Sequence, residues 1–87
     1  MKRGDILRDA DILTHGPRDD IYGDVITNHE RISRLWSVVL ETEITPAQAA
    51  LCMALVKVAR LIQTPDHIDS FVDGAAYLAI AGECATE

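Results

Sequence analysis

The stretch DHIDSFVD at residues 66–73 sets the organisation of this chain of 87 residues. It opens a predicted helix that runs to about Glu83, with Asp66 as the N-cap. Asp69 falls in the first turn, where the positive end of the helix dipole favours a carboxylate. Asp73 lies one turn further on, and neither capping nor the dipole accounts for it. The stretch therefore predicts a helix start and an acidic cluster on one helix face.

The helix before this stretch has the clearest start in the chain. Residues 45–48, TPAQ, form a capping-box pattern with proline at the first helical position. The helix is expected to end near Ile62, before a turn at residues 63–65. Apart from Lys57 and Arg60 it is apolar nearly all round. We therefore expect it to be the most buried helix, or to lie in a subunit interface.

Two earlier helices complete the predicted fold. The first is expected to follow an N-cap at Asp5 and to end at the breaker sequence of residues 15–17, HGP. After a polar loop, the second is expected to begin at Thr27 and to end near Leu40. The predicted fold is an all-α bundle of about four helices in a single domain, residues 1–87, with the last two helices as an antiparallel hairpin.

Charge and composition narrow the classes of partner. The net charge of −6 argues against binding to a nucleic-acid backbone, which requires a basic surface. No apolar run reaches the ~18 residues of a membrane helix, and early charges rule out a signal-peptide core. Cys52 and Cys84 are predicted free thiols, Cys52 in the core, which fits a reducing cytoplasm. The three histidines lack zinc spacing and are expected at the surface or in caps.

The last two helices are expected to bring opposite charges together. With the turn centred at residues 64–65, Arg60 lies level with Asp69, and Lys57 lies level with Asp73. The spacing within each helix puts both of its charged residues on one face. Two interpretations stay open: a pair of salt bridges that sets the register of the hairpin, or a ligand site.

The ligand interpretation draws on three helices. Carboxylates one helical turn apart can hold Mg²⁺, basic side chains can hold phosphate, and an aromatic ring can stack on a base. No catalytic residue is assigned. The predicted ligand-binding residues are Tyr22, Asn28, Arg31, Lys57 and Arg60, with Trp36 as an alternative ring, and the predicted metal ligands are Asp69 and Asp73.

These residues carry a resemblance to a small family of phage and prophage proteins, known as a domain of unknown function. It covers roughly residues 6–83, and the pattern His-x-Asp-Ser-x-x-Asp at residues 67–73 is its most specific part. One departure is Ala76, where the family pattern has glycine. The matching positions are Tyr22, Gly23, Asp24, Asn28, Arg31, Trp36, Met53, Lys57, Arg60, His67, Asp69, Ser70, Asp73, Tyr77 and Glu83.

The chain also resembles the all-α nucleoside triphosphate pyrophosphatases of the MazG and dUTPase type. In those bundles, carboxylates on two helices bind Mg²⁺ beside the nucleotide phosphates. The resemblance implies that role for Asp69 and Asp73. The chain departs from the pattern in its first acidic motif, a cluster of glutamates, for which it offers only Glu30.

Three functional hypotheses follow. The first is a phage-encoded protein that binds or hydrolyses a nucleotide, with Mg²⁺ as its cofactor. The second is a protein without enzymatic activity that binds a host protein through the apolar third helix. The third is a structural module without a ligand. In each case we expect a symmetric homodimer, because a chain of this size cannot surround a helix that is apolar on nearly every side.

Overall fold

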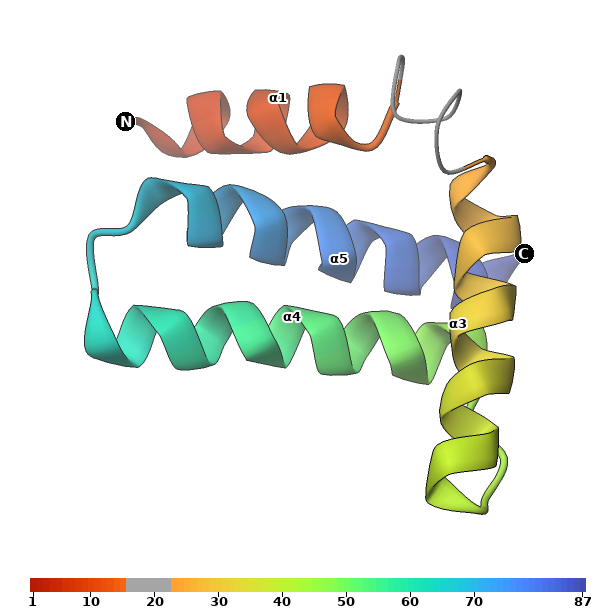
Figure 1. The fold of residues 1–87 in the computed structure, drawn as a ribbon. Coiled ribbons are helices and arrows are strands. Elements are labelled where there is room, and N and C mark those ends of the chain that lie inside the picture. The colour runs from red at the N-terminus through yellow and green to blue at the C-terminus, as the bar shows by residue number, and fades with distance from the viewer. Residues whose placement is uncertain (16–22) are drawn as a thin grey trace.

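The protein, seen in a computed structural model, is described here over residues 1–15 and 23–87. Those residues form four helices and no strand: α1 (Arg3–Leu13), α3 (Val25–Leu40), α4 (Pro46–Gln63) and α5 (Ile68–Thr86) (Figure 1). The predicted all-α bundle is confirmed.

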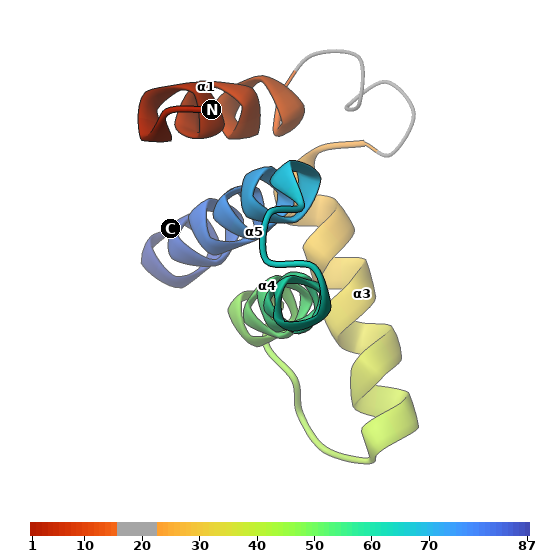
Figure 2. The same ribbon diagram turned by 90° about the vertical axis from the view of Figure 1, so that its left-hand side faces the viewer.

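Three of the helices, α1, α5 and α4, lie in a row, and α3 crosses the α4–α5 hairpin (Figure 1). Helices α4 and α5 run antiparallel as a hairpin, as predicted, and α1 packs on the side of α5 away from α4 (Figures 1 and 2). Helix α3 crosses this row near the first turns of α4, and its later half extends past α4. The described parts of α1, α3 and α4 thus surround α5 on three sides.

One helix start agrees with its prediction in detail. Thr45 is the N-cap of α4, and its Oγ1 accepts a hydrogen bond of 3.1 Å from the Gln48 amide. The Gln48 side chain accepts one of 2.9 Å from the Thr45 amide. This reciprocal pair satisfies two backbone donors that the helix itself leaves free.

The other predicted N-caps are wrong. The N-cap of α3 is Asp24, whose carboxylate accepts a bond of 3.1 Å from the Thr27 amide, so the predicted cap lies inside the helix. In α1 the cap is Lys2, and Asp5 at N3 accepts the Lys2 backbone N–H at 3.1 Å. Helix α5 is capped by His67 rather than Asp66. A short polar side chain fits several positions of a first turn, so spacing alone does not select the cap.

The core is built of small side chains. Small residues let helices approach closely, and at Gly74 a Cβ would lie 3.7 Å from Cβ of Lys57 on α4. Among the described residues, the buried hydrophobic ones are Ala10, Ala49, Ala50, Ala54, Ala76, Ile80 and Ala81.

Two burial predictions for α4 are wrong. The helix is not the most buried one, because four large aliphatic side chains on one side, Leu51, Leu55, Val58 and Ile62, are exposed. Cys52 is exposed as well and is not a core residue. The described elements pack only on the other side of α4, whereas α5 has neighbours on three sides: α1, α3 and α4.

Candidate functional site

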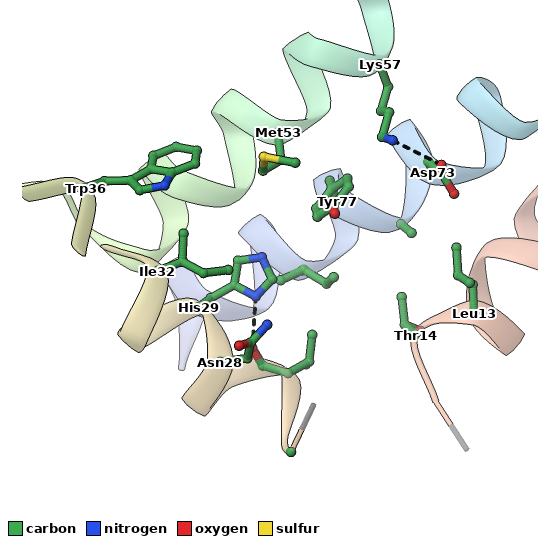
Figure 3. Close-up of a pocket in the computed structure, with 14 residues that line it drawn as sticks. Leu13, Thr14, Asn28, His29, Ile32, Trp36, Met53, Lys57, Asp73 and Tyr77 are labelled. Carbon is green, nitrogen blue, oxygen red and sulfur yellow. Dashed lines mark hydrogen bonds and ion pairs between the residues drawn. The ribbon is translucent and has the colours of Figure 1, made fainter. Parts of the chain in front are cut away.

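A pocket of about 360 Å³ lies where the four helices meet (Figure 3). Its walls combine apolar and aromatic side chains with a few polar groups, which is typical of small-molecule sites. The lining residues are Leu13, Thr14, Gly23, Val25, Asn28, His29, Ile32, Trp36, Met53, Lys57, Asp73, Ala76, Tyr77 and Ile80.

His29 is the polar residue most enclosed in this pocket. It is only 3% exposed, and its Nδ1 lies 2.9 Å from the carbonyl oxygen of Val25. Because a carbonyl can only accept, Nδ1 carries the proton, and Nε2 of the neutral ring is an acceptor. Nε2 is buried and has no hydrogen-bond partner within the described parts of the chain. It lies on the side of the ring that faces Met53 and Tyr77 (Figure 3).

Lys57 and Asp73 form an ion pair across the α4–α5 hairpin. Nζ of Lys57 lies 3.3 Å from Oδ2 of Asp73, and the side chains are 12% and 31% exposed. The register prediction for this pair is confirmed. Both residues line the pocket, so the pair belongs to the site rather than to a sealed core.

Aromatic rings from two helices line the same pocket. Tyr77 of α5 meets the His29 imidazole in an edge-on arrangement, with 6.2 Å between ring centroids and 65° between planes. Trp36 of α3 lies on the far side of His29 from Asn28, and Met53 of α4 lies between Trp36 and Tyr77 in this view (Figure 3). The aromatic rings and the thioether thus form the apolar part of the pocket wall.

The structure brings together only some of the predicted ligand-binding residues. Asn28 and Lys57 line the pocket. Arg31 is exposed at its edge, with Nη1 3.9 Å from the position that a Cβ would take on the lining residue Gly23. Arg60 is exposed and does not line the pocket, and Tyr22 lies outside the described residues.

The second predicted ion pair is absent. Arg60 and Asp69 are both exposed, and no ion pair joins them, in contrast to Lys57 and Asp73. An exposed pair gains little over solvation, so nothing holds two such side chains together near the turn of the hairpin. The predicted contact between Arg60 and Asp69 is therefore wrong.

The two predicted metal ligands lie on the α1 side of α5. Asp69 and Asp73 line a shallow hollow there together with Asp9. In residues 1–15 and 23–87, no group of three or more His, Cys, Asp or Glu side chains is placed to hold a metal ion. Asp73 is also already engaged by Lys57. The described donors do not complete a metal site by themselves.

Sequence reasoning missed the central residue of the pocket. His29 was expected at the surface or in a cap, and its burial corrects that prediction. The available signal was its place one helical turn after Val25 and one before Ile32 and Ser33, on the face that packs inward. The same spacing lets its Nδ1 bond the Val25 carbonyl.

Fold and site together define a small all-α protein with an amphipathic pocket between its described helices. The chain belongs to the family described as Domain of unknown function (DUF6378), whose sequence model matches residues 5–85. It is 40% identical over 76 residues to the Gene 55 protein of Mycobacterium phage L5, covering 86% of this chain and 49% of that protein. It is 43% identical over 72 residues to the Gene 55 protein of Mycobacterium phage D29, covering 83% and 48%.

These similarities decide between the two resemblances. The chain belongs to a small family of phage proteins, as predicted. The comparisons give no support to the resemblance to MazG-like enzymes. The chain spans about half the length of the curated relatives it matches. No solved structure matches it. Among the described helices, none has the length and apolar character that crossing a membrane requires.

Proposed function

We propose that the pocket binds the heterocyclic base of a nucleotide, with the phosphates outside it on the side of Arg31. The observation that carries this proposal is the unpartnered Nε2 of His29, in a side chain that is 3% exposed. A buried polar atom without a partner costs free energy, which a ligand that donates a hydrogen bond would recover. The ring and amino N–H groups of bases are such donors.

The size and walls of the pocket support a flat ligand. The volume of about 360 Å³ lies within the range of small-molecule sites, roughly 300–1,000 Å³. The rings of Trp36 and Tyr77 supply faces for stacking, a contact with a base that is worth about 1–3 kcal/mol. Asn28 adds an amide that can both donate to and accept from the edge of a base.

The charges favour a base inside the pocket and phosphates outside it. Lys57 and Asp73 neutralise each other at 3.3 Å, so the interior offers no net positive charge to a bare phosphate. The guanidinium of Arg31 is exposed beside Gly23, at the rim, and can bind phosphate oxygens in bidentate fashion.

Magnesium enters the proposal only with the nucleotide. Mg²⁺ commonly binds to one or two carboxylates together with the phosphates of the substrate. Asp69 is the exposed carboxylate available for this, and Asp73 would first have to leave Lys57. Base binding therefore should not require Mg²⁺, whereas the contribution of the phosphates should increase with it.

The proposal is tested by titrating the protein with a nucleoside, its mono- and triphosphates, and inorganic pyrophosphate, with and without Mg²⁺. Calorimetry gives Kd, and the shift of the unfolding transition gives an independent measure. A ligand at one hundred times its Kd adds about 2.7 kcal/mol of stability. We expect at least one nucleoside to bind, and its nucleotides to bind more tightly.

The decisive variant is His29→Asn. The shorter amide can still donate to the Val25 carbonyl, as Nδ1 does, but it lacks a group at the position of Nε2. We expect at least a tenfold weaker Kd, about 1.4 kcal/mol. Arg60→Ala serves as the control outside the pocket and should leave nucleoside binding unchanged. Tight binding of pyrophosphate with no response to any nucleoside would contradict the proposal.

A role as an interaction protein is the second candidate. The exposed aliphatic side chains on α4 favour it, since exposed apolar patches mark contact surfaces.

Release of pyrophosphate from the bound nucleotide, as in MazG-like enzymes, is a finer form of the first candidate. A pyrophosphate assay during the titration tests it, and nucleoside binding without release would leave a binding protein.

A further inference from the structure

The side of α4 that faces away from the pocket is apolar and uncovered. Its stripe consists of Leu51, Leu55, Val58 and Ile62, which are 45%, 64%, 50% and 80% exposed; we call it the outer face of α4. At 100° per residue it lies roughly opposite Met53 and Lys57, which line the pocket.

No charge interrupts the outer face. The neighbours on its edges are the neutral residues Gln48 and Ala59. Lys57 is turned into the pocket, and Arg60 lies on the Lys57 side of the helix, three residues further on. In paired helices, the residues at the helix–helix contact are aliphatic and are spaced alternately by three and four residues. The outer face of α4 has this pattern.

The spacing of the stripe is the same read in either direction. Its steps are four, three and four residues, symmetric about the midpoint between Val56 and Lys57. A twofold axis through that midpoint places Leu55 opposite Val58 of a second helix, and Leu51 opposite Ile62. A surface that complements itself under such a rotation is what a symmetric dimer requires.

We propose that the outer face of α4 binds the outer face of a second copy of this chain, with the two α4 helices antiparallel. The helix dipoles then run in opposite directions, which is their favourable arrangement side by side. The same register sets the C-terminal end of each α4 beside the N-terminal end of the other, so the opposite ends of the two helix dipoles lie next to each other.

The small core gives the chain a reason to pair. Ile80 is the one large aliphatic residue among the buried hydrophobic residues described, and the others are alanines. A 60-residue domain buries only about 60% of the surface that unfolding exposes, so small helical units gain much from further apolar burial. Covering four large side chains from each copy adds burial where the monomer lacks it.

The oligomeric state tests this inference. Light scattering with size exclusion over a wide concentration series should give the mass of two chains for the wild type. Leu55→Glu should give the mass of one chain, because it buries a charge at the seam. Leu7→Glu is the matched control, since Leu7 on α1 is also 64% exposed, and it should stay dimeric. A wild type of one-chain mass at every concentration, or a dimeric Leu55→Glu, would overturn the inference.

A second measurement keeps the test decisive if Leu55→Glu does not fold. Both native cysteines are first replaced by serine. Chains with Leu55→Cys and chains with Val58→Cys are then mixed and oxidised gently. We expect disulfide-linked pairs of unlike chains, and far fewer from Leu7→Cys mixed with Val58→Cys. Equal yields from the two mixtures would overturn the antiparallel register, since it alone brings residues 55 and 58 together.

Discussion

The two sides of α4 differ in how their side chains are used. On the inner side, Met53 and Lys57 have partners: a pocket wall and the carboxylate of Asp73 at 3.3 Å. On the outer side, the equally helical Leu55 and Ile62 are 64% and 80% exposed. A helix that is apolar on both sides therefore does not reveal from its sequence which side becomes buried. The positions of the neighbouring helices determine which side is buried.

Breaking the ion pair on the inner side should have the largest effect. In Asp73→Ala, Lys57 keeps a charge in a side chain only 12% exposed and loses its partner. We expect a loss of about 3 kcal/mol in the free energy of unfolding. This value is at the lower end of the range for removing one partner of a buried ion pair, because Asp73 is partly exposed. Urea unfolding at fixed protein concentration measures it. Asp69→Ala, at an exposed position, should change stability by less than about 0.5 kcal/mol.

Enlarging an alanine compares the two sides directly. Ala50 is fully buried between α4 and α5, so Ala50→Leu should destabilise by about 2 kcal/mol through overpacking. Ala59 is exposed on the same helix, and Ala59→Leu should be close to neutral. Thermal unfolding of both variants measures the contrast. Equal losses would mean that the outer side of α4 is as tightly packed as the inner side.

A smaller effect is expected where α3 ends, before the chain turns into α4. Glu41 is the C-cap of α3 and has the left-handed φ of 53°, which favours glycine. Glu41→Gly should stabilise the protein by about 0.5–1 kcal/mol, because side chains with a Cβ are strained there. The midpoint of urea unfolding measures the gain. Glu43→Gly, in the extended connection, should instead lose stability.

The reactivity of the two cysteines, one on α4 and one on α5, compares the two helices without a change in stability. Partial burial, and then the charges of Glu83 and Glu30, raise the pKa of the Cys84 thiol on α5. Less thiolate is present at a given pH, so alkylation of Cys84 should be slower than that of the exposed Cys52. The alkylation rate at Cys84 should therefore continue to rise above the pH at which an ordinary free cysteine is fully ionised. Mass spectrometry of single-cysteine variants resolves the two rates.

Near the α4–α5 turn, the register could be predicted but not every contact. Lys57 meets Asp73 because antiparallel helices joined by a short turn have little freedom to slide. Arg60 and Asp69 are level in the same register but remain exposed and unpaired with each other. Register depends on covalent geometry, whereas an ion pair at the surface depends on a small free energy that solvation can cancel.

Interactions between residues close in the sequence were enough to predict the helices, the capping box of Thr45 and Gln48, and the hairpin of the last two helices. Those features depend on interactions between residues close in the chain. Only the tertiary structure decided that His29 is buried with a free acceptor, that Trp36 and Tyr77 share its pocket, and that one side of α4 is uncovered. These depend on where α3 crosses the hairpin, which results from packing between helices distant in the chain.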